Sequence, residues 1–151
     1  MTAPVVRDAA AGDAAPLVPL MAQLGYPATE DEVRARLLAL LARGDRALVA
    51  ELDGTVVGLV TAHRTPVVHR DGDVGRITSL VVHDRARGAG VGRALVRAAA
   101  ALLHEAGCRR IEVTSNKRRT EAHAFYASLG YSEGSAHFVA VLPEKMPSAE
   151  A

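Results

Sequence analysis

Apolar positions in the first third of the chain recur at helical spacing. Between Asp13 and Gly25 they fall at i, i+3, i+4 and i+7, so they share one face of a predicted helix. Thr29 followed by Glu32 is a capping-box signature and predicts the start of a second helix, which closes at Gly44. The apolar residues of the two stripes are Leu17, Leu20, Met21 and Leu24, then Val33, Leu37, Leu40 and Leu41. Such stripes are typical of helices that pack on a core.

Short apolar runs bounded by turn residues predict strands. The Asp53-Gly54 dipeptide separates the runs 47–52 and 55–61, and it supplies the positive φ angles that a two-residue hairpin turn requires. The segment 4–7 is short and apolar, and it predicts an edge strand. The stretch 63–73 is polar and carries a Pro and a Gly, so we expect a mobile connection there.

The second half of the chain alternates strands with helices. A strand over 75–82 runs into a glycine-rich turn, and a long Ala/Leu/Val-rich helix follows, with Gly107 as its C-cap. Three further elements are expected: a strand over 110–114, a helix over 121–129 and a last strand over 137–142. A strand, helix and strand in this order form a right-handed unit with parallel strands.

The element order predicts an α/β fold. We expect one domain over residues 1–143, with a mixed, partly parallel central sheet flanked by about four helices. Residues 144–151 are expected to form a flexible tail. The length of 151 residues and the hydrophobic content of 49% suit one domain with one core.

Charge and composition narrow the function classes. A formal charge of +1 and an aromatic content of 3% argue against nucleic-acid binding. No apolar run reaches the roughly 18 residues of a membrane span, and the first residues lack the features of a signal peptide. The single cysteine, Cys108, agrees with a reducing compartment, so we expect a cytoplasmic protein. The six histidines lack the close pairing of a zinc site, so no metal is expected.

The turn after the strand 75–82 has the features of an anion site. Gly88, Gly90 and Gly92 allow close approach of the backbone, and they stand where the long helix begins. The first N–H groups of a helix have no intrahelical partner and the macrodipole is positive there, so an anion is held. No Lys and Ser/Thr pair follows Gly92 as in a Walker A loop, and no GxGxxG spacing occurs.

The spacing RxxGxG, formed by Arg87, Gly90 and Gly92 directly after a β-branched strand, resembles the acyl-CoA pyrophosphate loop of the GNAT superfamily of N-acetyltransferases. The resemblance implies acetyl-CoA as co-substrate. It implies that the backbone N–H groups near 80–82 hold the pantetheine and polarise the acetyl carbonyl. The donor-binding residues so implied are Leu80, Val81, Val82, Arg87, Gly88, Ala89, Gly90, Val91, Gly92 and Arg93.

A second stretch, 115–131, resembles the same family independently. It has an Asn after a strand, an Ala/Phe/Tyr helix and a Leu-Gly-aromatic exit. If the family's site residues are carried over to this chain, Asn116 would contact the pantetheine arm. Tyr126 would lie near the CoA sulfur as the candidate general acid. The alternative for Tyr126 is a ring packed on the core with its hydroxyl at the surface.

The strand before the glycine turn departs from the family pattern, because RITSLVVH carries no carboxylate where many members have a Glu base. The candidates for the general base are Asp73, His83 and Glu112, acting directly or through water, and an amine that is already neutral needs none. Cys108 raises the alternative of a covalent acetyl intermediate. Its expected place at the opposite end of the sheet favours a buried, inert thiol.

The resemblance implies direct acetyl transfer to a primary amine. We expect this amine to belong to a small molecule, for which an aminoglycoside is one example. A protein amine and a non-catalytic acyl-CoA-binding module are the alternatives. Acceptor specificity is expected to reside in the N-terminal helices and in the connection 63–73. For a polycationic acceptor, the acidic residues expected around the pocket are Glu30, Asp31, Glu32, Asp71 and Asp73. Dimers are common in the family, so a homodimer is also expected.

Overall fold

The computed structural model describes residues 2–114, 120–134, 138–145 and 147. The chain divides into two compact units, Met1–Val113 and Thr114–Ala151. The first unit contains the sheet and three α-helices, and the second contains one α-helix. Asn116 lies outside the described residues.

The elements of the first unit alternate as the α/β prediction requires. Its strands are β1 (Val5–Asp8), β2 (Arg46–Leu52), β3 (Thr55–Thr65), β4 (Asp73–Val82) and β5 (Cys108–Val113). Its helices are α1 (Ala14–Leu24), α2 (Glu30–Ala42) and α3 (Val91–Glu105), with 3-10 turns η1 (Ala11–Asp13) and η2 (Asp84–Ala86). The second unit contributes α4 (Thr120–Ser128).

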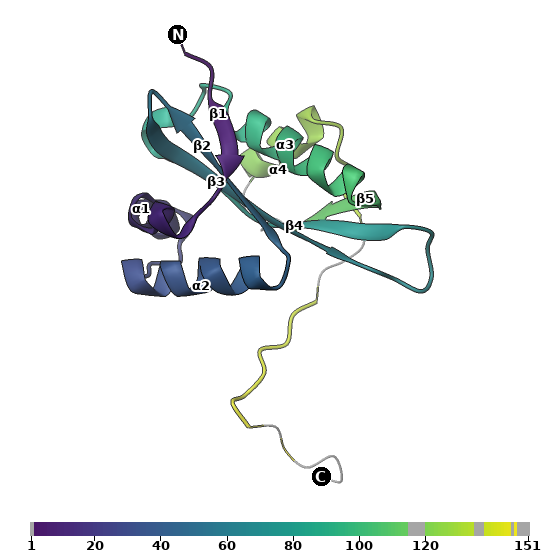
Figure 1. The fold of residues 1–151 in the computed structure, drawn as a ribbon. Helices are drawn as coiled ribbons and strands as arrows, with labels where there is room; N and C mark the ends of the chain where they lie inside the picture. Colours follow the sequence, from purple (N-terminus) through teal and green to yellow (C-terminus); the bar gives the residue numbers. More distant parts are fainter. Residues whose placement is uncertain (1, 115–119, 135–137, 146, 148–151) are drawn as a thin grey trace. The chain divides into compact units, whose positions relative to one another are not determined.

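The five strands form one sheet in the order β1-β2-β3-β4-β5 (Figure 1). The first three neighbouring pairs are antiparallel, and β4 and β5 are parallel with α3 as their crossover. This confirms the mixed, partly parallel sheet and the expected edge strand at β1. A parallel pair needs a crossover of this length, which is why the glycine turn stands between β4 and a long helix.

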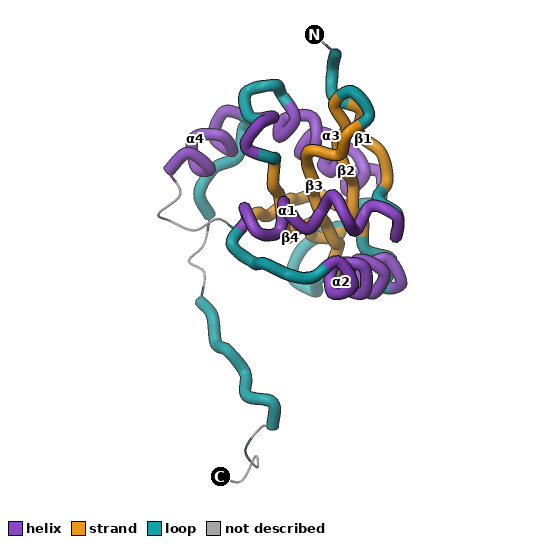
Figure 2. Tube along the Cα trace, turned by 90° about the vertical axis from the view of Figure 1, so that its left-hand side faces the viewer, coloured by secondary structure: helices purple, strands orange, loops and turns teal. Residues whose placement is uncertain are grey.

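Helices cover both faces of this sheet. Figures 1 and 2 show α1 and α2 against one face and α3 against the other. On the α1/α2 face, side chains of β2, β3 and β4 join the helical stripes, whose fully buried members include Leu17 and Leu20. On the α3 face, Leu95 and Val96 are fully buried. The two apolar faces of the sheet fix where α3, and with it the glycine turn, must lie.

Local chemistry sets the ends of the helices where the sequence predicts them. The Thr29 hydroxyl accepts a hydrogen bond from the Glu32 N–H at 3.1 Å, and the Glu32 carboxylate accepts one from the Thr29 N–H at 3.0 Å. This is the expected capping box. In the β2–β3 hairpin, Asp53 and Gly54 have φ of 51° and 79°, which confirms the predicted two-residue turn.

The turn before α1 contains a buried carboxylate. Asp13 accepts two hydrogen bonds from the Arg7 guanidinium, at 2.8 and 2.9 Å, and one from the Ala10 N–H at 2.8 Å. The Arg7 guanidinium holds the pKa of the Asp13 carboxyl below its usual value, and the Ala10 N–H acts in the same direction. This bidentate pair ties β1 to the start of α1.

Two expectations about the strands were wrong. Residues 63–65 belong to β3, which pairs with the first residues of β4, so the connection is limited to 66–72. The expected last strand over 137–142 does not form within its described part, 138–142, where Phe138, Val141 and their neighbours are exposed. Strand formation depends on a partner as much as on the side chains, and an apolar run alone does not supply one.

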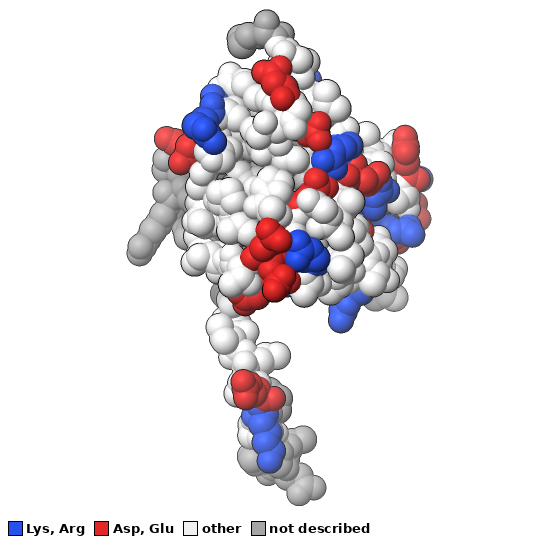
Figure 3. Space-filling model, turned by 60° about the vertical axis from the view of Figure 1, so that its left-hand side comes forward, with Lys and Arg blue, Asp and Glu red and all other residues white. Residues whose placement is uncertain are grey.

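Charges on the surface are mixed in sign. On the face drawn in Figure 3, basic and acidic side chains lie next to one another. Arg34, for example, pairs with Glu30 at 2.7 Å and with Asp31 at 3.1 Å. Among the helices that the structure describes, none has the length and apolar character to cross a membrane.

Candidate active site

Strand β4 has two halves with different neighbours. Residues 74–77 pair with β3 on one side and with β5 on the other, and Asp73 pairs with β5. From Ser79 to Val82 the strand still pairs with β3, but in the described part of the chain its ladder with β5 ends at Ile77. The second half therefore has backbone donors and acceptors on one edge that a ligand can use.

A β-bulge marks the boundary between the two halves. The register of β3 and β4 shifts so that Thr61 pairs with Ser79 while Ala62 pairs with Ile77, which leaves Thr78 as the extra residue. A bulge bends its strand and sends neighbouring side chains to the same face. The Thr61 hydroxyl lies 2.7 Å from the Thr78 hydroxyl and also hydrogen-bonds the Ser79 hydroxyl.

The glycine turn follows the second half of β4. His83 begins η2, and its Nδ1 accepts a hydrogen bond from the Arg85 N–H at 3.2 Å. Gly88 and Gly90 have φ of 82° and 80°, a region that glycine enters without steric cost. A Cβ at either glycine would meet no atom of the chain within 4 Å. The glycines thus serve the backbone conformation and leave open space beside it.

The N-terminus of α3 opens from this turn. Gly90 is the N-cap, and within the described chain no side chain caps the helix. The first N–H groups and the positive end of the dipole therefore attract an anion. Arg87 and Arg93 are exposed beside them, and Arg87 pairs with Asp84 at 3.1 Å. Turn, helix end and arginines together fit a phosphate group.

The predicted donor-binding residues of β4 differ in burial. The Val81 side chain is buried in the core with α1 and α2, whereas Leu80 and Val82 are half-buried and alternate with it. The side chain of Val81 thus has a structural role. The resemblance to the family implies that the backbone at 80–82 would contact a ligand.

Tyr126 lies on α4 in the second unit. Its ring packs edge-on against Phe125 and Tyr131, with centroids at 5.2 and 5.6 Å. The N–H of Tyr131 donates to the Tyr126 carbonyl at 3.0 Å around Gly130, whose φ is 91°. This is a Schellman motif, and it gives the Leu-Gly-aromatic exit a physical role. Burial raises the pKa of the Tyr126 phenol to about 12, and the Tyr131 phenol acts in the same direction.

The three candidate bases have different surroundings. Asp73 starts β4, five residues before the bulge and thus roughly 16 Å away along the strand, and it pairs with Arg64 at 3.4 Å. The Nδ1 of His83 accepts a hydrogen bond from the Arg85 N–H in η2, so the neutral ring carries its proton on Nε2 and offers a donor there. Glu112 pairs in register with Arg76, two residues before the bulge. Among the three, the register brings the carboxylate of Glu112 nearest to the bulge.

Cys108 is buried at the first residue of β5. Its register partner is Asp73, at the opposite end of β4 from the glycine turn. Burial raises the pKa of this thiol, and Asp73 acts in the same direction. A buried thiol with a raised pKa is a poor nucleophile, so the geometry opposes a covalent acetyl intermediate on it.

Gly58 is a site-forming residue that the sequence prediction did not include. A Cβ there would lie 2.9 Å from Leu95 Cδ1 and from Val91 Cγ1, and 3.3 Å from the Val81 carbonyl oxygen. The missing side chain therefore lets the first turns of α3 rest on β3. A glycine inside an otherwise apolar strand was the one indication of close approach.

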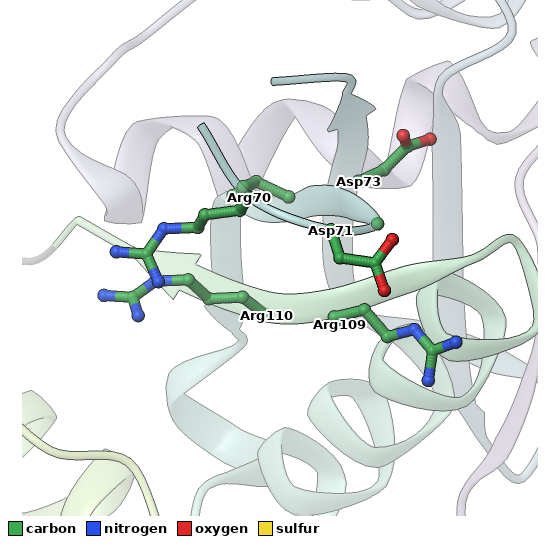
Figure 4. Close-up of a pocket in the computed structure, with 7 residues that line it drawn as sticks. Arg70, Asp71, Asp73, Arg109 and Arg110 are labelled. Atoms are coloured by element: carbon green, nitrogen blue, oxygen red, sulfur yellow. The ribbon is translucent and has the colours of Figure 1, made fainter. Parts of the chain in front are cut away.

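An open hollow of about 310 Å³ lies at the other end of the sheet (Figure 4). It is lined by the connection before β4 and by the start of β5: Arg70, Asp71, Gly72, Asp73, Val74, Arg109 and Arg110. In Figure 4 Arg70 and Arg110 point in one direction, away from Asp71 and Asp73. The hollow is thus remote from the glycine turn, and the five acidic residues expected near the acceptor divide between it and the first turn of α2.

No group of three or more His, Cys, Asp or Glu side chains in the described residues could hold a metal ion.

Comparisons with known proteins agree with this geometry. A family model described as "Acetyltransferase (GNAT) family" matches residues 19–131 of the chain. The chain is 32% identical over 120 residues to an aminoalkylphosphonate N-acetyltransferase from Salmonella typhimurium, covering 80% of this chain and 76% of that protein. It is also 32% identical over 136 residues to an aminoglycoside N(6')-acetyltransferase type 1 from Stenotrophomonas maltophilia, covering 87% and 88%.

A solved structure shows the same architecture. The putative acetyltransferase from Agrobacterium tumefaciens str. C58 aligns with a TM-score of 0.83 at 28% identity, over 91% of this chain and 99% of that one. The glycine turn, the half-paired β4 and the parallel crossover lie within the matched region. The chain therefore belongs to the acetyltransferase (GNAT) family and is an acyltransferase that uses acetyl-CoA.

Proposed function

We propose that this enzyme transfers the acetyl group of acetyl-CoA directly to a primary amine of a small molecule. The observation that carries the proposal is the second half of β4, which is paired on one side and leads straight into the open turn at the start of α3. One edge of the strand can hold an extended thioester arm, and the helix end can hold its phosphates.

The donor contacts follow from this arrangement. The backbone at 80–82 would bind the pantetheine arm and polarise the acetyl carbonyl, and the turn 87–93 would bind the pyrophosphate. The residues we assign to the donor are Leu80, Val81, Val82, Arg87, Gly88, Ala89, Gly90, Val91, Gly92 and Arg93, with Asn116 and Tyr126 from the second family signature. Positioning supplies most of the rate, because the thioester is already activated.

The chemical step is a direct displacement in a ternary complex. The neutral amine attacks the carbonyl carbon, a C–N bond forms, and the C–S bond breaks with its electron pair on sulfur. The amine loses one proton and the thiolate gains one, so the products are an amide and the CoA thiol. Tyr126 is the proposed donor to the sulfur.

The pKa of Tyr126 defines how it can act. A phenol with a pKa of about 12 stays protonated at neutral pH, so it can always offer a hydrogen bond to the departing sulfur. Full transfer to a thiolate whose conjugate acid has a pKa of about 8.5 is uphill. We therefore expect Tyr126 to stabilise the thiolate by hydrogen bonding, with proton transfer completing as CoA leaves.

The acceptor class follows from the relatives. Their names give an aminoalkylphosphonate and an aminoglycoside as acceptors, both small molecules that carry amines. We propose the same class here, with a protein or peptide amine as the alternative that the assay below distinguishes.

The test measures acetyl-CoA binding by calorimetry and CoA release over a panel of amines that includes aminoalkylphosphonates, aminoglycosides and a lysine peptide. Released thiol can be followed with a thiol reagent, because the protein's own Cys108 is buried. We expect turnover with a small amine. Failure to bind acetyl-CoA contradicts the donor assignment, and turnover of the peptide alone contradicts the acceptor assignment.

Replacing Tyr126 by Phe tests the role of the phenol. We expect kcat to fall about tenfold or more, while acetyl-CoA affinity changes little. Tyr131→Phe is the matched control, since its ring makes the same edge-on contact. A near-ultraviolet difference titration between wild type and Tyr126→Phe should show ionisation near pH 12, above the usual value of about 10. Unchanged kcat contradicts the assignment.

A homodimer and a cytoplasmic location remain predictions from the sequence. Light scattering on the purified protein tests the first, and fractionation of expressing cells tests the second.

A further inference from the structure

Three hydroxyl groups meet at the bulge between the two halves of β4. Thr61 of β3 is central, with its Oγ1 2.7 Å from Thr78 Oγ1 and in a further hydrogen bond with Ser79 Oγ. The bulge creates this cluster, because it turns two successive residues of β4 toward one residue of β3. In a regular ladder, Thr78 and Ser79 would point to opposite faces. We refer to Thr61, Thr78 and Ser79 as the hydroxyl cluster.

The hydroxyl cluster lies on the α1/α2 face of the sheet and is accessible. Thr61 shares a face with Leu59, and Ser79 shares it with Val81, both of which are buried against α1 and α2. Thr78 is exposed, while Thr61 and Ser79 are half-buried. The cluster thus stands on the α1/α2 face at the start of the half of β4 that would hold the donor.

The cluster offers neutral hydrogen-bonding groups. Each hydroxyl has one proton and two lone pairs, and the two internal hydrogen bonds engage two of the protons. One proton and several lone pairs remain for a ligand. A primary amine fits this set, because its N–H groups can donate to the hydroxyl oxygens while its lone pair points elsewhere.

Resting on the proposed function, we infer that the hydroxyl cluster binds the acceptor's amine nitrogen and aims its lone pair at the thioester carbonyl held by residues 80–82. Thr61 and Thr78 are its specificity-determining groups, and they select an N–H donor without carrying charge. The cluster occupies the part of β4 that has no carboxylate, so this chain orients its amine with hydroxyls.

The cluster cannot serve as a terminal base, because a neutral hydroxyl that accepts a proton must release another. As the C–N bond forms and the C–S bond breaks, the amine proton passes through a hydroxyl to water. The titratable or charged groups on this face of the first unit's strands are Arg7, Glu51, His63, Arg76, Arg110 and Glu112, and Asp13 of η1 pairs with Arg7. On the helices they are Glu30, Asp31, Glu32, Arg34 and Arg36 of α2, whereas α1 has none.

The test compares Thr61→Val with Thr61→Ser. Valine has the shape of threonine without the hydroxyl, so it removes both internal hydrogen bonds with little change in volume. We expect Thr61→Val and Thr78→Val each to raise KM for the amine, so that kcat/KM falls about tenfold. This is the size expected when one or two neutral hydrogen bonds are lost. Thr61→Ser should stay within about threefold of wild type, and KM for acetyl-CoA should not change.

Thr65→Val is the matched control, because Thr65 is exposed on the same strand beyond the cluster. Thermal unfolding of every variant separates a loss of structure from a loss of recognition. The inference is overturned by an unchanged amine KM in Thr61→Val, or by equal rises in both KM values accompanied by a lower unfolding temperature. A wild-type protein that binds acetyl-CoA but acetylates no amine contradicts the proposed function first, and this inference falls with it.

Discussion

The two halves of β4 share one backbone but not one role. Residues 74–77 are enclosed by β3 and β5, and Gly75 meets Leu103 closely on the α3 face. Residues 78–82 have β3 on one side only in the described chain, and they lead into the glycine turn. A glycine lies under α3 at the level of each half. Gly75 belongs to the first half, and Gly58 of β3 pairs with Val82 of the second half.

The difference shows how one strand can be both scaffold and binding edge. A complete ladder satisfies the backbone and anchors the strand, whereas an incomplete one leaves groups that a substrate can pair with. The bulge at Thr78 lies where the complete ladder gives way to the incomplete one. Changes in the first half should therefore alter stability alone, and changes in the second half should alter donor or acceptor binding as well.

The largest contrast is expected between Gly90→Ala and Gly107→Ala. Both glycines have positive φ, 80° and 100°, and neither has an atom of the chain within 4 Å of a Cβ, so both variants incur a similar backbone strain of about 1 kcal/mol. Only Gly90 caps the helix end that would hold the donor. We expect the Kd for acetyl-CoA to rise about 30-fold, or about 2 kcal/mol, in Gly90→Ala alone, measured by calorimetry. Equal effects in both variants contradict the donor site.

The next contrast pairs Gly58→Ala with Gly75→Ala. In each variant the new Cβ would approach a leucine Cδ1 to 2.9 Å, of Leu95 or of Leu103. We expect each to lower the free energy of unfolding by about 1.5 kcal/mol in urea titrations. Gly58→Ala should also raise the KM for acetyl-CoA, because it lifts the first turns of α3. If Gly75→Ala raises this KM to the same extent, the two halves are not separate.

The smallest contrast concerns exposed arginines. Arg87→Ala should raise the KM for acetyl-CoA about fivefold at low salt, and less at high salt, because an exposed charge is screened. Arg110→Ala, at the other end of the sheet, should leave it unchanged, since its 3.7 Å pair with Glu112 is a surface contact. Steady-state kinetics at two salt concentrations measure both. A salt-independent effect of Arg87→Ala would point to a structural cause.

Much of the fold and of the proposed donor site follows from local sequence. The capping box at Thr29 and the Asp53-Gly54 turn form as predicted, because they depend on residues within one turn of each other. The glycine turn likewise needs only positive φ at Gly88 and Gly90 before a helix. The expected strand over 137–142 failed in its described part, since a strand also needs a neighbour.

The sequence by itself determined the order of the elements up to α4, the capping box of α2, the glycine turn before α3 and the lack of a carboxylate in residues 75–82. These are properties of neighbouring residues, which spacing records. The tertiary structure alone decided that β4 has two unequal halves, that Gly58 admits α3, and that Thr61 meets Thr78 and Ser79. Those features depend on the register between strands, and a shift of one residue there changes which side chains share a face.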